Sequence, residues 1–328
     1  MLPVRNSRHT YCVSDYGWSD TWFFDPNIST YSNQLDVMSG DDAPNLRWDL
    51  FTGATGYGNC NDLTSPGTGC GWLGPSLDQG TLNPTSKNTN WSVVSGQGVH
   101  YVVPNSQAQS QIQHPDAMRI TITTTANDLR AELRFDILNT STTRTLTNLL
   151  LGDYFNFHTN GSSGTASDSN ASRNQGIAYY LPGTDARCPA GSACIYTEGN
   201  RARSDFIADG RMWGSLITGG VATPTNPTNW MIGSAGSFNP AGGGSIPVAN
   251  RVWRLTELNS YNNPAAGTSF GRGDAAGAFQ WNLGSLAPGQ TISFLITKEL
   301  VELPEAATWQ LLLLGLCGFL ITRLRRTA

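Results

Sequence analysis

Apolar and polar residues alternate strictly between residues 129 and 138. Leucine, alanine, leucine, phenylalanine and isoleucine occupy the odd positions, and the even positions from Arg130 to Asp136 are charged. A period of two residues places one set on a core face and the other in water, which predicts a β-strand. Residues 118 to 123 alternate in the same way, and Ala126, Asn127 and Asp128 supply a turn. The pattern therefore predicts a β-hairpin.

Between residue 139 and residue 300 the chain again reads as strands separated by turns. Further strands are predicted at residues 147–157, 176–181, 211–217, 250–258, 278–283 and 290–299. In the last of these, Ile292, Phe294 and Ile296 share one face. Loops rich in Gly, Ser, Thr, Asn and Pro are predicted at residues 159–175, 219–229, 234–249 and 262–277. No stretch before the C-terminal tail has the period of a long amphipathic helix. We therefore expect an all-β, antiparallel, sandwich-like body with Gly/Ser/Asn-rich loops.

Residues 279–290 contain a Leu-x-Pro-Gly turn ahead of the final strand and resemble the last hairpin of many bacterial surface β-sandwiches. We divide the chain into an N-terminal region (1–110), a β-sandwich (111–300) and a tail (301–328). The first region is rich in aromatic residues and aspartates, a combination that is common in sites that bind sugar rings. Aromatic residues are also common in ordinary hydrophobic cores. A calcium site built from these aspartates is the other alternative, although no closely spaced Asp-x-Asp series is present.

The tail joins a charge-free apolar run, residues 311 to 321, to a terminus that carries Arg323, Arg325 and Arg326. We expect residues 306–322 to form one hydrophobic helix, just long enough to approach the roughly 30 Å core of a bilayer. The arginines would hold its end on the cytoplasmic side and leave the preceding chain outside. A buried C-terminal helix of a soluble domain is the alternative.

The order of these tail elements resembles a known sorting signal. Leu303, Pro304 and Glu305 precede Trp309, the apolar run and the arginines, as in the PEP-CTERM signal of Gram-negative bacteria that make exopolysaccharide. Ala306 replaces the usual third-position proline. A sortase signal fits less well, because Ala306 and Ala307 stand where it has Thr and Gly. The resemblance implies cleavage by an exosortase, an integral-membrane protease, and a path from the inner membrane to the cell surface or the extracellular matrix.

Export also requires a signal at the N-terminus. Residues 1–20 contain no apolar run of the length that a signal peptide needs. We therefore expect the true start to lie upstream, in a segment that encodes such a signal and that could also supply a thiol to pair with Cys12. Insertion by the tail alone is the alternative.

Composition and cysteines agree with an exported protein. Only 13% of residues are charged and the net charge is -4, which does not favour nucleic-acid binding. Cys60 and Cys70 flank one short turn-rich segment, and Cys188 and Cys194 flank another. Each pair is predicted to form a disulfide, with alternative connectivities left open by sequence. Metal ligation is less favoured, because no histidine has zinc-type spacing to these thiols.

Catalytic patterns are scarce. Six glutamates and eighteen aspartates show no spacing that selects a catalytic pair, and no nucleophile elbow, phosphate loop or dinucleotide motif is present. Glu132 is predicted to form a cross-strand ion pair. We assign no catalytic, cofactor or metal residue. The sequence favours a structural or binding protein of the cell surface or exopolysaccharide. Its rivals are a displayed glycosidase or polysaccharide lyase and an uncleaved single-pass membrane protein.

Overall fold

The described part of the chain is built from β-strands. The computed structural model describes residues 9–14, 19–23, 38–50, 70–73, 92–96, 99–103, 105–114, 118–127, 129–158, 176–198, 208–234, 263–273 and 275–302, and these ranges contain no helix. A membrane-crossing helix is accordingly not found among them. The predicted tail helix (306–322) and the predicted strand at 250–258 lie outside the described residues. The all-β prediction is confirmed for the part described.

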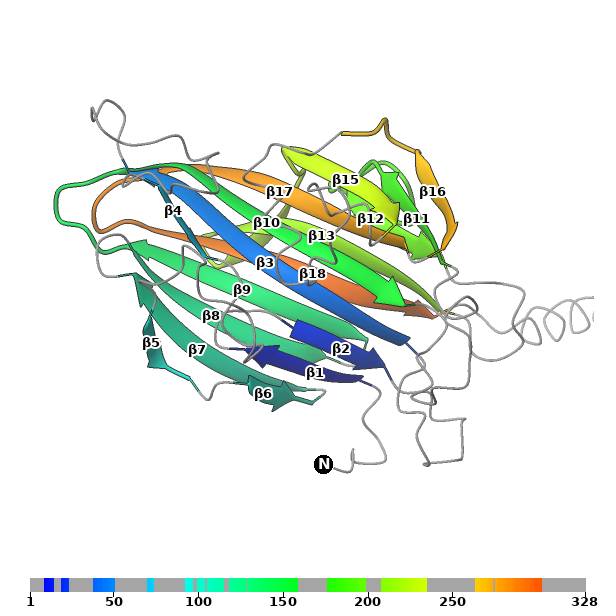
Figure 1. The fold of residues 1–328 in the computed structure, drawn as a ribbon, viewed down its shortest axis with the longest axis horizontal. Coiled ribbons are helices and arrows are strands. Elements are labelled where there is room, and N and C mark those ends of the chain that lie inside the picture. Colours follow the sequence, from blue (N-terminus) through cyan, green and yellow to red (C-terminus); the bar gives the residue numbers. More distant parts are fainter. Residues whose placement is uncertain are drawn as a thin grey trace, which may run out of the picture.

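One antiparallel sheet has eight strands (Figure 1). Its strands are β1 (His9–Ser14), β2 (Ser19–Phe23), β3 (Met38–Leu50), β4 (Cys70–Leu73), β6 (Val99–Val102), β10 (Leu146–His158), β15 (Asn229–Ser234) and β17 (Ala275–Leu286). They run in the order β15-β17-β10-β3-β2-β1-β6, and β4 pairs with β3. The long central strand β10 therefore has β3 on one side and β17 on the other.

The second antiparallel sheet has ten strands. Its strands are β5 (Ser92–Ser95), β7 (Ser106–His114), β8 (Met118–Asn127), β9 (Arg130–Asn139), β11 (Gly176–Leu181), β12 (Cys194–Glu198), β13 (Ala208–Thr218), β14 (Val221–Thr225), β16 (Ser269–Gly273) and β18 (Thr291–Glu302). They run in the order β16-β11-β12-β13-β18-β9-β8-β7-β5, and β14 pairs with β13.

The hairpin predicted from strict alternation is confirmed. β8 and β9 pair from Asn127 opposite Arg130 to Met118 opposite Asn139, and the odd positions of β9 are buried. Two predicted loops are wrong in part: residues 219–229 contain β14, and residues 262–277 contain β16 and the start of β17. The structure shows β14 and β16 to be short strands rich in Thr, Pro, Gly or Ser, a composition that favours loops in a sequence-based prediction.

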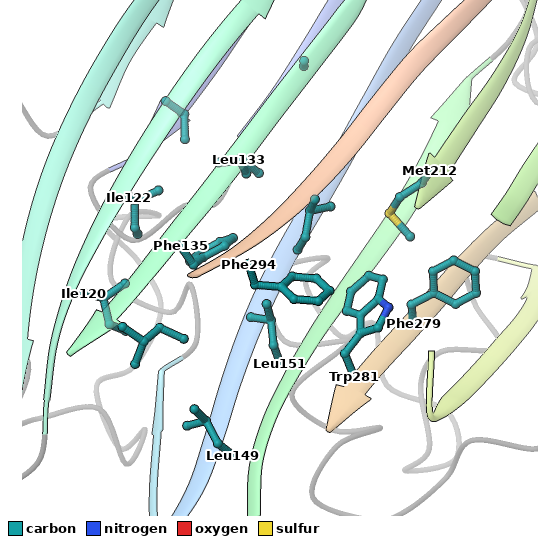
Figure 2. Packing of buried hydrophobic residues seen from close by; sticks show 14 of the residues in the cluster. Ile120, Ile122, Leu133, Phe135, Leu149, Leu151, Met212, Phe279, Trp281 and Phe294 are labelled. Carbon is teal, nitrogen blue, oxygen red and sulfur yellow. The ribbon is translucent and has the colours of Figure 1, made fainter. Parts of the chain in front are cut away.

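The hydrophobic core lies between the two sheets (Figure 2). Trp281 of the eight-stranded sheet meets Phe294 of the ten-stranded sheet with ring centroids 5.0 Å apart, and Phe279 meets Tyr180 at 6.1 Å. Tyr180 also stacks on Trp230 of the eight-stranded sheet, at 4.4 Å. These rings come from both layers, so their burial holds the sheets face to face.

Two glycines let the layers approach closely. A Cβ atom at Gly214 would lie 2.5 Å from the Trp281 ring and 2.6 Å from Phe294. In the opposite sheet, a Cβ atom at Gly277 would lie 2.4 Å from Ile195. Each sheet thus carries a glycine where a large side chain of the other sheet inserts, and neither position accepts a larger residue without displacing core atoms.

The connection from β17 to β18 corrects one sequence prediction. Residues 279–290 do contain a tight turn, in which the Gln290 amide donates to the Ala287 carbonyl at 3.0 Å and Gly289 has a φ of 72°. However, β17 pairs with β10 and β15, whereas β18 pairs with β9 and β13. The segment is therefore not a hairpin but a crossing from one sheet to the other. The connection from β9 to β10 crosses in the same way.

Asn139 fastens these two crossings together. Its side-chain Nδ2 donates to the carbonyls of Arg144 and Leu286, both at 2.8 Å. Its backbone N–H donates to Gln290, and its carbonyl accepts from Gly289, both at 3.0 Å. The side chain is fully buried. One residue thus satisfies backbone groups of both crossings at the same end of the sandwich.

We expect Asn139→Ala to lower the free energy of unfolding by about 1–3 kcal/mol, because two carbonyls lose a donor in a site with little access to water. Urea denaturation followed by tryptophan fluorescence would measure the change. Thr142→Ala, at an exposed position of the same connection, is the matched control and should change stability little. Equal stability of the two variants would contradict the fastening role.

Candidate functional site

Outward side chains of the ten-stranded sheet form rows that cross several strands. The register places Gln107, Thr125, Glu132, Thr297 and Trp213 in one row, and Gln109, Thr123, Arg134, Leu295 and Ser215 in the next. A third row contains Gln111, Thr121, Asp136, Ser293 and Ile217. Alternation along each strand brings these residues to the same face, opposite the core.

A ladder of amide–hydroxyl pairs joins β7 to β8 on this face. The Nε2 atoms of Gln107, Gln109 and Gln111 donate to the Oγ1 atoms of Thr125, Thr123 and Thr121, at 3.2, 3.1 and 3.1 Å. Each pair uses one amide hydrogen and one hydroxyl lone pair, so the glutamine carbonyl and the threonine hydroxyl hydrogen remain as further hydrogen-bonding groups. Gln107 and Gln109 are exposed.

A charged pair continues this polar surface onto β9. The guanidinium of Arg134, which is exposed, donates to Asp136 Oδ1 through Nε at 3.0 Å and Nη2 at 2.8 Å. We call the ladder and this pair the polar strip; its residues are Gln107, Gln109, Gln111, Thr121, Thr123, Thr125, Arg134 and Asp136. The strip offers donors and acceptors side by side, with a balanced local charge.

The strip ends at an open hollow of about 520 Å³. The hollow is lined by Arg119, Leu138, Asn139, Thr140, Ser141, Thr142, Pro288 and Gly289. Arg119 lies two residues before Thr121 and on the same outward face of β8. Thr140, Ser141 and Thr142 belong to the connection between β9 and β10. Asn139 already binds both crossings, and the Ser141 hydroxyl accepts from the backbone N–H groups of Thr143 and Arg144 at 3.2 and 2.9 Å. The Arg119 guanidinium and the hydroxyls of Thr140 and Thr142 are therefore the groups that could contact a ligand.

Another row crosses five strands on the same sheet face. The register aligns Tyr179, Tyr196, Arg211, Glu299 and Arg130, from β11 to β9. Glu299 accepts from Arg211 at 2.6 Å and from Arg130 at 2.9 Å. Both guanidinium carbons lie 5.5 Å from the centroid of the Trp213 ring, in cation–π geometry. The prediction that Glu132 forms a cross-strand ion pair is wrong, because Glu132 contacts Arg130 of its own strand at 3.8 Å. The cross-strand pair joins Arg130 to Glu299 instead.

The predicted disulfide between Cys188 and Cys194 is present, with Cα atoms 5.5 Å apart. It packs with Leu181, Tyr196 and Trp213 in a small apolar cluster. Arg187, the residue before Cys188, places its guanidinium carbon 5.2 and 5.4 Å from the ring centroids of Tyr179 and Tyr196. The Arg187 side chain therefore covers this end of the outer face.

Charge pairing holds Arg187 in that position. Its Nε and Nη2 atoms donate to the Asp185 carboxylate at 3.0 and 2.9 Å. These side-chain hydrogen bonds, together with one from the Arg187 backbone, lower the pKa of Asp185 to about 2. The carboxylate is therefore ionised throughout the neutral range, and the position of Arg187 does not depend on pH there.

Two tyrosine–carboxylate pairs lie beneath Arg187. The Tyr196 hydroxyl donates to Asp209, a fully buried carboxylate, and the Tyr179 hydroxyl donates to Glu198 at 3.3 Å. Burial, followed by the charge of Glu198, raises the pKa of Tyr179, so the phenol remains protonated and keeps donating. Tyr196 is only 5% exposed. Access of a substrate to this pair would require the cover to move.

An ion pair lies between the two sheets. Lys298 Nζ on β18 is 3.2 Å from Asp153 Oδ2 on β10, and the two side chains are 1% and 0% exposed. Sequence reasoning missed this pair, although the signal was present. Lys298 continues the inward series that starts at Ile292, Phe294 and Ile296, and Asp153 occupies an inward position after Leu149 and Leu151.

The other predicted site residues lie outside the described residues. These are the tail residues Leu303, Pro304, Glu305, Trp309, Arg323, Arg325 and Arg326, together with Cys60, so the sorting signal and the Cys60–Cys70 bond stay predictions. Side chains of the N-terminal aromatic residues and aspartates are likewise not described. Among the residues that are described, no group of three His, Cys, Asp or Glu could hold a metal ion.

Comparison with known proteins does not identify a family. No protein-family model and no curated protein sequence matches the chain. Among solved structures, a putative aldose 1-epimerase from Escherichia coli K12 covers 90% of this chain and 99% of its own length, with 10% identity and a TM-score of 0.35. A likeness this weak supports no argument about the function of this chain.

Proposed function

We propose that this chain is an exported protein of the bacterial cell envelope that binds an extracellular polysaccharide through the polar strip. The observation that carries the proposal is the amide–hydroxyl ladder on β7 and β8, continued by the Arg134–Asp136 pair on β9. Sugar hydroxyls both donate and accept, and a surface that offers amide carbonyls, hydroxyls, a guanidinium and a carboxylate matches both roles.

The spacing of the strip suits a polymer. Outward residues two apart on a strand are separated by about 6.8 Å, so the ladder repeats its groups at a regular interval along β7 and β8. A chain lying along these strands would meet similar partners at each step and would reach the hollow at Arg119. The Arg134 charge is neutralised by Asp136, so the strip does not favour a phosphate backbone.

Carboxylate pairing supports binding over hydrolysis. Each carboxylate whose side chain is described contacts a cation or a phenol: Glu132 with Arg130, Asp136 with Arg134, Asp153 with Lys298, Asp185 with Arg187, Glu198 with Tyr179, Asp209 with Tyr196, and Glu299 with Arg130 and Arg211. A glycosidase needs two carboxyls facing a sugar across an open cleft. These carboxylates serve the fold instead.

The tail supplies the envelope location in this proposal. The series from Leu303 to Arg326 would insert in the inner membrane and present Pro304–Glu305 to an exosortase-type protease, which releases the body to the surface or the matrix. Changing Arg323, Arg325 and Arg326 to glutamate should abolish correct insertion. Protease accessibility on intact cells measures the result, and unchanged surface display of the variant would contradict the topology.

Affinity electrophoresis tests the binding surface. The probes are gels that contain laminarin, dextran, alginate or the exopolysaccharide harvested from producing cells. We expect one of them to retard the wild-type protein. Gln109→Ala, Gln111→Ala and Arg134→Gln combined should weaken that binding about tenfold or more, because each lost hydrogen bond is worth roughly 0.5–1.5 kcal/mol.

The matched control combines Thr218→Ala and Thr223→Ala, at exposed positions beside the β13–β14 turn, away from the strip. This control should bind as the wild type does. Failure of all four gels to retard the wild type, or equal retardation of the strip variant and the wild type, would overturn the proposed binding role.

A further inference from the structure

Lys298 and Asp153 meet inside the sandwich, each from a different sheet. Asp153 belongs to β10 of the eight-stranded sheet, and Lys298 belongs to β18 of the ten-stranded sheet. Nζ lies 3.2 Å from Oδ2, and both side chains are essentially fully buried. Lys298 is also one of only two lysines in the chain, the other being Lys87.

The surroundings of the pair are apolar. On β18 the inward neighbours of Lys298 are Ile296 and Leu300, and on β10 the inward residue before Asp153 is Leu151. Phe279 pairs with Asp153 across the strands and is fully buried. Removing two full charges from water into such surroundings is unfavourable, and their mutual attraction repays it only in part.

We propose that Lys298 and Asp153 form a covalent amide that links the two sheets. In the first step the ammonium gives one proton to the carboxylate, which produces a neutral amine and a neutral acid. The amine nitrogen then bonds to the Asp153 carboxyl carbon, and the bond from that carbon to its hydroxyl oxygen breaks. The leaving hydroxyl and one amine hydrogen depart as water. No oxidant, reductant or cofactor enters this balance.

The geometry favours this reaction in three ways. The apolar interior makes it costly to keep two full charges there. The Nζ–Oδ2 contact of 3.2 Å holds the amine beside the carboxyl group, which replaces a bimolecular encounter by a fixed contact. The product carries no charge, so its formation removes the cost of keeping two ions in the core.

The amide would close a covalent loop from β10 to β18 across the sandwich. The two sheets would then stay joined after the core is denatured, which neither hydrogen bonds nor packing can achieve. Such a link is independent of the polar strip, and its presence or absence does not depend on the proposed binding role.

Intact mass spectrometry of the purified, disulfide-reduced protein, expressed as residues 1–328 with the tail uncleaved, tests the proposal. We expect a mass about 18 Da below the value computed from the sequence, because one water molecule has left. Trypsin should then fail to cleave after Lys298 and should still cleave after Lys87. Fragmentation should identify a branched peptide that joins the segment of Asp153 to the segment of Lys298.

Lys298→Arg is the matched variant, because it keeps the charge and removes the reactive amine. It should have the full sequence mass. If this variant does not fold, the mass and the peptides of the wild-type protein decide the proposal without it. A wild-type protein with the full sequence mass overturns the proposal. So does a mass deficit without the branched peptide, as a succinimide at Asp209–Gly210 would produce.

Discussion

Lys298→Met is expected to lower the free energy of unfolding by about 3–5 kcal/mol, because Asp153 would stay in the core without its ammonium partner. Methionine has a similar length, so lost packing adds little to the change. If the pair is linked covalently, the variant also loses the link, and the decrease is at least this large. Guanidinium denaturation of both proteins at pH 7 would measure it.

The double variant Lys298→Met with Asp153→Leu separates charge from packing. It has no unpaired carboxylate, so it should be more stable than Lys298→Met alone. A single variant within 1 kcal/mol of the wild type, or a double variant less stable than the single one, would show that the buried charge does not dominate this site.

Trp281→Ala is expected to cost about 3–5 kcal/mol, as for other large core aromatics. Trp281 is 1% exposed, contacts Phe279 and Phe294 in ring geometry, and donates its indole N–H to the Thr225 carbonyl at 3.2 Å. Removal would open a cavity where the two sheets meet. Thermal unfolding followed by circular dichroism would measure the loss.

Gly214 provides an internal check on that contact. Gly214→Ala should destabilise the wild type, since the added Cβ would meet the Trp281 ring. The same change should cost less in the Trp281→Ala background, where that ring is gone. Equal costs in both backgrounds would indicate that the ring and the glycine are not in contact. Val221→Ala, at an exposed position, controls for the loss of a side chain in general.

The strands best predicted from sequence are those with one face buried in the core and the other face exposed to solvent. β9 alternates without interruption because its outward residues are at least partly exposed and its inward residues face the core. β8 and β18 follow the same alternation over most of their length, although Thr123 and Thr297 are buried on the outward face. β14 and β16 gave no such signal, since an exposed or half-exposed short strand needs no apolar series. Their strand structure depends on pairing with β13 and β11, which local sequence does not encode.

The sheet to which a strand belongs was harder to predict than the strand itself. Ala287, Pro288, Gly289 and Gln290 form a tight turn, and the same turn chemistry serves a hairpin or a crossing between sheets. What distinguishes the two here is Asn139, which lies far away in the sequence and binds both crossings. A pattern confined to the turn could not reveal that partner.

The candidate site shows a similar division. The Cys188–Cys194 bond was predicted from spacing and turn composition. The glutamines of the polar strip occupy alternate positions of β7, so a search for polar periodicity would have found them. The pairing of Lys298 with Asp153 required knowledge of which strands face each other across the core. The sequence pattern alone could show only that Lys298 and Asp153 each occupy an inward-facing position of a strand.

The order of strands in the eight-stranded sheet has a consequence for folding kinetics. β10 lies between β3, which ends at Leu50, and β17, which begins at Ala275. The backbone N–H and C=O groups on the β17 side of β10 therefore have no strand to pair with until almost the whole chain has been synthesised. Contacts of such long sequence separation form slowly. A chain delivered through a membrane from its N-terminus would emerge with β10 exposing an unpaired edge, a state prone to intermolecular strand pairing. We therefore expect refolding in vitro to be slow and to yield less native protein as its concentration rises.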